Sequence, residues 1–377
     1  MHKNFKYRIY PTRSQETTLN KWLEECRLLY NNFLEQRKTS WESEKKGVNF
    51  HAQVVSIPPM KKKRPQLTTV HSQVLQNVAM RVDLAYKAFF RRCKAGEEPG
   101  YPRFKGYGRY DSITFPQVPS GCSIKDDRLF VSKIGLISTE FHRPIEGVPK
   151  TATIQHTSTG KWFVIFSCEI PENTMPAIAA QVGIDVGLKS FATMSNGESI
   201  EAPKFFRSEE KELAKAQRKL DKETKGTKER AKKRKVVSRI HERIRNRRSN
   251  FTHQLSRNIV NSFGVICVED LQVNRMLHNH CLAKSISDAA WSEFFSRLSS
   301  KAAEAGRTMV KVNPAYTSQT CSQCGHRQKL KLSDRVFDCP CCGLHIDRDL
   351  NAAVNILTLG LQSQGLSREA HAFQAWK

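Results

Sequence analysis

Two pairs of cysteines near the C-terminal end constrain the fold of this chain more than any other feature. The first pair lies in Cys321-Ser-Gln-Cys324-Gly and the second in Cys339-Pro-Cys-Cys342-Gly. In each pair a tight turn can direct two thiolates toward one centre, and the following glycine lets backbone amides approach the sulfur atoms. Four thiolates complete a tetrahedral shell around zinc and leave no position for a substrate. We therefore predict one structural Zn²⁺ at these four residues, with Cys341 outside the shell.

The other cysteines indicate the redox environment. The chain has 11 Cys, an odd number, and its first residues lack the apolar stretch of an export signal. Both features favour a reducing cytoplasm over a secreted, disulfide-bonded protein. Six cysteines are scattered along the chain, and we interpret them as small core residues: Cys26, Cys93, Cys122, Cys168, Cys267 and Cys281.

The net charge indicates a polyanionic partner. The formal net charge is +26 and the pI is about 9.8, whereas the surface of an ordinary enzyme mixes both signs. A membrane surface would also attract such a chain. However, the longest apolar run, residues 263–268, is far shorter than the roughly 20 residues of a spanning helix. We therefore expect nucleic acid, and no membrane, as the partner.

Hydrophobic spacing and turn residues predict a multidomain α/β chain. We expect helices over residues 12–33, 70–95, 208–257, 288–306 and 349–359, with Gly360 ending the last one. We expect strands over residues 4–10, 112–115, 128–131, 136–138, 152–156, 162–169, 264–268 and 308–312, and a strand, turn and strand over 182–194. Residues 45–66 are rich in Lys and Pro, which favours a loop or a mobile basic arm.

Two segments have compositions that suit nucleic-acid contact. Residues 100–109 alternate aromatic, basic and glycine residues, a composition suited to stacking on bases and clamping phosphates, or to a tyrosine-rich surface turn. In residues 201–250, Lys and Arg outnumber Asp and Glu by 19 to 8. This pattern fits long helices with one face on the protein body and one facing a polyanion, although a merely solvated hairpin is the alternative.

Three acidic residues stand out by their surroundings. Asp185 lies in an apolar strand, Glu269 ends the apolar run Val265-Ile-Cys-Val, and Asp349 opens the last helix. A carboxylate in a buried strand is costly unless it is paired or binds a metal. If the three converge, they can hold two Mg²⁺ ions for phosphodiester hydrolysis. Each residue also has an ordinary interpretation: a turn acid, a salt-bridged strand end and a helix N-cap, respectively.

Six segments occur in an order that is informative when they are taken together: Phe5-Lys-Tyr-Arg-Ile-Tyr-Pro-Thr, Pro102-Arg-Phe-Lys, Gly183-Ile-Asp-Val-Gly-Leu-Lys-Ser, Val268-Glu-Asp-Leu, Tyr316-Thr-Ser-Gln-Thr-Cys-Ser-Gln-Cys-Gly325 and Asp347-Arg-Asp-Leu-Asn-Ala-Ala-Val-Asn-Ile356. With these motifs the chain resembles the TnpB family of transposon-encoded proteins, the relatives of type V CRISPR effectors. The resemblance covers nearly the whole chain and is densest over residues 181–356.

The resemblance implies an RNA-guided DNA endonuclease that acts as a monomer with its RNA. A guide RNA from the transposon end would pair with double-stranded target DNA next to a short flanking motif, in the cytoplasm of a prokaryote and at its nucleoid. One RuvC site would cut both strands with Mg²⁺, and Asp185, Glu269 and Asp349 match the family's catalytic acids. The acid two residues before Asn-Ala-Ala is the matching one, which is Asp349 rather than Asp347.

The resemblance also implies a domain organisation. An RNase H-like (RuvC) nuclease domain with an inserted zinc ribbon would follow an N-terminal β wedge domain that carries a helical recognition insert. The expected bounds are residues 1–10 and 105–180 for the wedge-like domain, 11–104 for the recognition domain, 181–315 for the first part of the nuclease domain with a basic helical insert at 205–258, 316–345 for the zinc ribbon, and 346–377 for the last part of the nuclease domain and the tail.

Two other functions stay open. A guide-dependent DNA-binding regulator without cleavage would be expected to lack one of the three acids, and all three are present. A transposase that joins strands would also use an acidic triad, but the resemblance argues against strand transfer.

Overall fold

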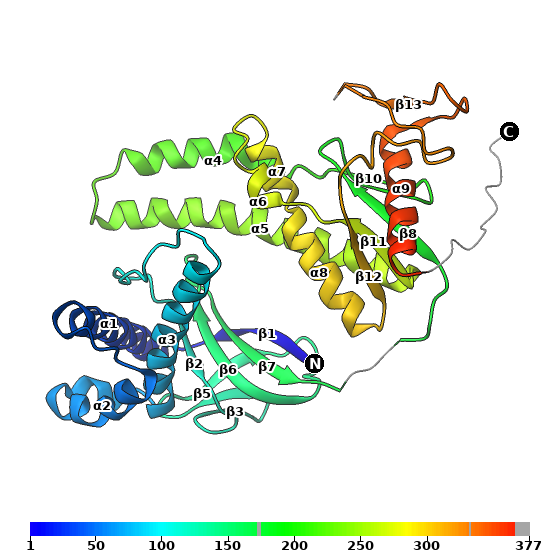
Figure 1. The fold of residues 1–377 in the computed structure, drawn as a ribbon. Helices are drawn as coiled ribbons and strands as arrows, with labels where there is room; N and C mark the ends of the chain where they lie inside the picture. Colours follow the sequence, from blue (N-terminus) through cyan, green and yellow to red (C-terminus); the bar gives the residue numbers. More distant parts are fainter. Residues whose placement is uncertain (172–174, 332, 366–377) are drawn as a thin grey trace. The chain divides into compact units, whose positions relative to one another are not determined.

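The computed structural model describes residues 1–171, 175–331 and 333–365 (Figure 1). The chain divides into two compact units, Met1–Pro171 and Glu172–Lys377. Each unit contains its own sheet and its own hydrophobic core. The chain is therefore a multidomain α/β protein, as predicted. Among the described residues, no helix is both long and apolar enough to span a membrane.

The first unit is built on a seven-stranded antiparallel sheet with the order β2-β6-β7-β1-β5-β4-β3. The N-terminal strand lies inside this sheet, where it pairs with β7 and β5. The strand bounds are β1 His2–Tyr10, β2 Ser112–Phe115, β3 Cys122–Lys125, β4 Arg128–Val131, β5 Gly135–Glu140, β6 Val148–His156 and β7 Trp162–Glu169. All are at or near predicted positions except β3, which the sequence analysis missed.

Three helices complete the first unit: α1 Arg13–Glu44, α2 Phe50–Lys63 and α3 Ser72–Lys94, with a short 3₁₀ helix at Pro65–Thr69. The capping box that begins α1 is formed by Thr12 and Gln15. The hydrophobic stripe of α1 is buried in the core against α3 and the sheet.

The prediction of a loop over residues 45–66 was wrong, because α2 occupies most of this segment. Asn49 caps the helix by accepting a hydrogen bond from the Ala52 N–H. Gln53 is fully buried, where its amide donates to the Phe33 carbonyl and accepts from Arg37. These buried contacts outweigh the helix-breaking tendency of the two prolines inside the helix.

Residues 100–109 lack regular secondary structure but are fixed to the helices of the first unit. The backbone N–H and carbonyl of Lys105 both hydrogen-bond to the Asn31 amide, and Arg27 donates to the same carbonyl. The Tyr101 hydroxyl lies 2.6 Å from that of Tyr86. Tyr107 is 86% exposed. Residues 100–109 thus form a loop that is anchored to α1 and α3 by hydrogen bonds and carries an exposed tyrosine.

The second unit contains a five-stranded mixed sheet with the order β10-β9-β8-β11-β12 (Figure 1). β11 lies parallel to both β8 and β12, whereas β8, β9 and β10 form antiparallel hairpins. The strand bounds are β8 Gln181–Val186, β9 Ser190–Met194, β10 Ser199–Glu201, β11 Val265–Glu269 and β12 Thr308–Val312. Parallel neighbours bring the carboxyl ends of β8 and β11 to one edge of the sheet.

The C-terminal helix α9, Arg348–Ser363, packs directly on β8 and β11. The prediction that Gly360 ends this helix was wrong. Gly360 lies inside α9, where a Cβ would stand 2.3 Å from Cys267 Sγ. Its lack of a side chain therefore serves close packing of the helix on the sheet, not termination.

The remaining helices of the second unit are α4 Phe205–Asp221, α5 Lys228–Ser262, α6 Val273–Met276, α7 Ala283–Ala289 and α8 Trp291–Glu304. Helices α4 and α5 are the long basic helices predicted for this segment, and they form a hairpin joined by ion pairs from buried Glu209 to Arg243 and Arg247. The single helix predicted over residues 288–306 is interrupted, because Ala290 adopts a left-handed conformation with φ 56°.

The prediction that all six scattered cysteines are core residues was wrong for two of them. Cys93 and Cys281 are exposed. The other four, Cys26, Cys122, Cys168 and Cys267, are buried.

Candidate metal centre and acidic site

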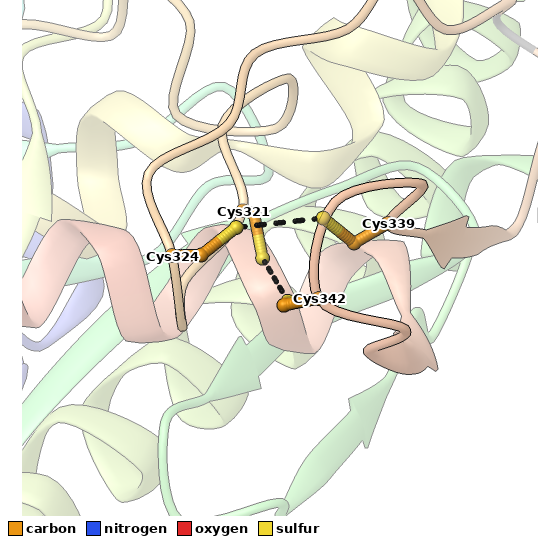
Figure 2. Close-up of side chains that lie close together, drawn as sticks. All are labelled: Cys321, Cys324, Cys339 and Cys342. Atoms are coloured by element: carbon orange, nitrogen blue, oxygen red, sulfur yellow. Dashed lines mark hydrogen bonds between the residues drawn. The ribbon is translucent and has the colours of Figure 1, made fainter.

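The four predicted cysteine ligands lie together in one cluster. Figure 2 shows Cys321 facing Cys342 and Cys324 facing Cys339, with Sγ–Sγ distances of 3.6 and 3.5 Å. All four sulfur atoms lie within 4.8 Å of one another. Because Zn–S bonds of about 2.3 Å in a tetrahedron place the sulfurs about 3.8 Å apart, the cluster fits one zinc ion. Cys341 is exposed and lies outside the cluster.

The two cysteine pairs have matching backbone geometry. Gly325 and Gly343 both have positive φ, 76° and 74°, and each donates its N–H to the carbonyl of the first cysteine of its pair at 3.0 Å. A residue with a side chain would be strained in this conformation. Strands β13, Val336–Asp338, and β14, His345–Asp347, form the hairpin that presents the second pair. Phe337 of β13 is fully buried in a small core with Cys321 and Cys339.

Two of the three predicted acids lie on neighbouring parallel strands. Val268 of β11 is in register with Ile184 of β8, so Glu269 and Asp185 follow at adjacent positions. Asp185 is paired with Thr193 of β9 inside the sheet. Asp185 is therefore a strand residue and not a turn acid.

The third acid lies in the first turn of α9. The N-cap of this helix is Asp347, whose carboxylate accepts hydrogen bonds from the N–H groups of Asp349 and Leu350 at 2.9 and 3.1 Å. Asp349 is thus not the cap, and its half-buried carboxylate instead receives a hydrogen bond from Arg348 at 3.2 Å.

The electrostatics connect the three carboxylates. Burial raises the pKa of Asp185 well above its usual range, and repulsion by the charges of Glu269 and Asp349 raises it further. Burial also raises the pKa of Glu269, which is 8% exposed, while a hydrogen bond from Thr317 opposes that rise. Asp185 therefore lies close enough to be affected by the charges of both Glu269 and Asp349, and these three residues are called the acidic group.

The acidic group is wider than the thiol cluster. Among the described residues, only the four cysteines form a group of three or more metal-binding side chains with all ligand atoms within 4.8 Å of one another. Two Mg²⁺ ions about 3.5–4 Å apart each need their own oxygen ligands, so these ligands occupy a wider region than the four ligands of a single zinc ion. The donor chemistry of the acidic group, oxygen only and net negative, fits such ions.

The structure adds polar residues that sequence patterns did not single out. Thr317, between β12 and the first cysteine pair, donates from its hydroxyl to Glu269 Oε1 at 2.6 Å. Asn351 and Asn355 lie one turn apart on α9, and both donate to the Thr320 carbonyl. Only the Asn-Ala-Ala and Thr-Ser-Gln-Thr segments of the resemblance marked this region, and they assigned no role to these side chains.

Three family descriptions match parts of the chain. The family described as "Probable transposase" matches residues 165–280, and the domain described as "Cas12f1-like, TNB domain" matches residues 291–356. A "Helix-turn-helix domain" matches residues 1–46. In the structure these first 46 residues contain β1 and the single long helix α1, and α2 begins only at Phe50.

Curated relatives match almost the whole chain. A "Putative RNA-guided DNA endonuclease" of Streptomyces pristinaespiralis is 37% identical over 95% of this chain and 89% of the relative. A "Putative RNA-guided DNA endonuclease InsQ" of Escherichia coli K12 is 30% identical over 94% and 92%. A "TnpB-like protein L770" of a mimivirus of Acanthamoeba polyphaga is 24% identical over 95% and 73%.

A solved structure shares the fold. The chain in the cryo-EM structure of a Cas12f1–sgRNA–target DNA complex matches with a TM-score of 0.61 at 15% identity, covering 94% of this chain and 98% of that chain. A sequence identity of 15% is too low to transfer an activity to this chain, but the two chains share a fold. Taken with the near full-length match to the curated relatives, these findings show that the chain belongs to the TnpB family.

Proposed function

We propose that this protein is the RNA-guided DNA endonuclease of a transposon, which hydrolyses target DNA at the site formed by Asp185, Glu269 and Asp349. The names of its near full-length relatives support guided cleavage. Its partners would be a guide RNA from the transposon end and double-stranded target DNA, bound by a monomer at the nucleoid of a prokaryotic cell. The net charge of +26 suits both nucleic acids.

The acidic group carries the proposal. Asp185 of β8 and Glu269 of β11 lie at the ends of neighbouring parallel strands, and burial together with the charges of Glu269 and Asp349 opposes ionisation of Asp185. Such an arrangement is costly for folding alone and is characteristic of functional sites. A bound cation would relieve the repulsion and let all three groups ionise.

Each of the three acids would have its own role in the hydrolysis. Mg²⁺ ions, when bound, would lower the pKa of a water and neutralise charge on the leaving oxygen. Asp185 would carry the central ligand charge, because it lies within the electrostatic reach of both other acids. Glu269 would supply a ligand from the adjacent strand, and Asp349 would supply one from the start of α9. Asp349 can do so because the N-cap of that helix is Asp347. A regulator without cleavage would have no need of this buried charge.

The proposal is tested by cleavage of a plasmid library with randomised bases beside the guide-matched target. The protein would be co-expressed with the RNA from the end of its own transposon and assayed with and without Mg²⁺. Double-strand cuts that need Mg²⁺ and select one flanking motif are the expected result. Motif-selective binding without cuts, by protein with all three acids intact, would favour the regulator instead.

A further inference from the structure

A buried hydrogen bond connects the zinc-ribbon region to the acidic site. The Thr317 side chain is 4% exposed, and its hydroxyl lies 2.6 Å from Glu269 Oε1 and 3.2 Å from the Pro314 carbonyl. A hydroxyl has one proton to donate. The Glu269 carboxylate is both nearer and the stronger acceptor, so the proton is donated to it rather than to the Pro314 carbonyl. Thr317 therefore holds the Glu269 carboxylate in one fixed orientation.

The backbone of Thr317 is itself held by α9. The Asn355 amide donates to the carbonyls of Thr317 and Thr320 at 2.8 and 2.7 Å. Asn351, fully buried one turn earlier, donates to the Thr320 carbonyl and accepts from the Ser322 N–H. The segment that leads into the first cysteine pair is thus fastened to the helix that begins with Asp349.

The cysteine pair fixes the other end of this segment. Thr320 forms a β-bridge with Arg327, and the Cys321 N–H donates to the His326 carbonyl. These contacts close the turn that directs Cys321 and Cys324 into the thiol cluster. The position of the Thr317 hydroxyl is consequently set by contacts to α9 on one side and by the zinc ribbon on the other.

We propose that Thr317 is a positioning residue of the nuclease site, which orients the Glu269 carboxylate for metal binding and makes the site depend on the folded zinc ribbon. The inference rests on the proposed function, because it assumes that Glu269 binds the catalytic metal. Partners that orient a metal-binding carboxylate are worth about 10-fold to 100-fold in metal affinity or activity. Thr317 would act through Glu269 and would not touch the DNA.

The test compares Thr317→Val, which removes the hydroxyl but keeps the shape, with Thr317→Ser, which keeps the hydroxyl. Thr358→Val is the matched control, because among the described residues the Thr358 hydroxyl bonds only to the Val354 carbonyl within α9. For each full-length protein with its RNA, three quantities are measured: zinc content, the rise in Tm caused by added Mg²⁺, and the Mg²⁺ concentration for half-maximal cleavage.

We expect T317V to retain zinc, to lose most of the Mg²⁺-induced rise in Tm, and to need about 10-fold to 100-fold more Mg²⁺ for cleavage. T317S and T358V should behave like the wild type. A T317V protein with the wild-type Mg²⁺ response would overturn the positioning role. Should T317V lose zinc, Thr317→Ala, which is smaller, replaces it in the same comparison with T317S.

Wild-type measurements separate the proposed function from the role of Thr317. A wild-type protein that neither cleaves nor gains stability with Mg²⁺ would contradict the proposed function itself. A wild-type protein that does both, alongside an equally responsive T317V, would contradict the role of Thr317 alone.

Discussion

Gly183 lies so close to Ala353 that a Cβ at position 183 would stand 2.1 Å from the Ala353 carbonyl oxygen. It would also lie 2.6 Å from the Leu357 nitrogen. Helix α9 therefore crosses β8 at a distance that only glycine permits. This close approach packs α9 against β8, and the charge of Asp349 in the first turn of α9 reaches Asp185.

Gly183→Ala should accordingly damage both stability and the acidic site. The added methyl group meets backbone atoms, which cannot rotate away, so α9 must move. We expect a loss of about 1–3 kcal/mol in the free energy of unfolding and strongly reduced cleavage. Denaturant unfolding and a cleavage assay check this. Gly47→Ala is the control, since a Cβ there meets no atom within 4 Å. Wild-type stability and cleavage in G183A would contradict the packing argument.

Substitutions of Asp347 should lower stability, whereas substitution of Asp349 should abolish cleavage. Asp347→Ala removes the N-cap of α9 and should cost about 0.5–2 kcal/mol in stability, while Asp347→Asn retains an acceptor and most of the stability. Asp349→Asn should leave stability near the wild-type value but abolish cleavage. Thermal unfolding and cleavage of the three variants check the assignment. Normal cutting by D349N would exclude Asp349 from the site.

The raised pKa of Asp185 predicts how the stability of the Mg²⁺-free protein depends on pH. Between the ordinary carboxyl pKa and the raised one, the folded state binds more protons than the unfolded state, so stability falls as pH rises through that window. Asp185→Asn should lessen this fall and raise Tm at neutral pH, by about 2–4 °C for each kcal/mol gained. Melting curves without Mg²⁺ at several pH values from about 5 to 8 check this. A lower Tm for D185N at neutral pH would contradict the electrostatic account.

Zinc should be needed for folding of the ribbon. Cys324→Ser removes one of four ligands and should reduce zinc content, folded yield and Tm together. Cys341→Ser is the matched control, because its thiol is exposed and outside the cluster. Metal analysis and thermal unfolding provide the comparison. Equal zinc content in C324S and the wild type would contradict the four-cysteine site.

Local patterns were enough to locate the parts of the fold that local chemistry determines. Strand β12 has the predicted bounds, and the cysteine pairs form the predicted cluster. The prediction that Asp185, Glu269 and Asp349 act together rested on the family resemblance as well as on the apolar surroundings of each acid.

The errors arose where tertiary contacts override local preference. Helix α2 forms in spite of its prolines because Gln53 finds buried partners on α1. Gly360 continues a helix because Cys267 lies beneath it. The hydroxyl of Thr317 and the amide of Asn355 are unremarkable in sequence, since their importance depends on residues 48 and 38 positions away, respectively.

We have proposed that Asp185, Glu269 and Asp349 form one Mg²⁺-dependent cleavage site. The most direct measurement is guided cleavage by Asp185→Ala, Glu269→Ala and Asp349→Ala, with target binding by the same protein–RNA complexes measured alongside. We expect each variant to lose cleavage while binding of guide RNA and target DNA stays close to that of the wild type. Mg²⁺-dependent cutting at the wild-type rate by any one of the three would contradict it.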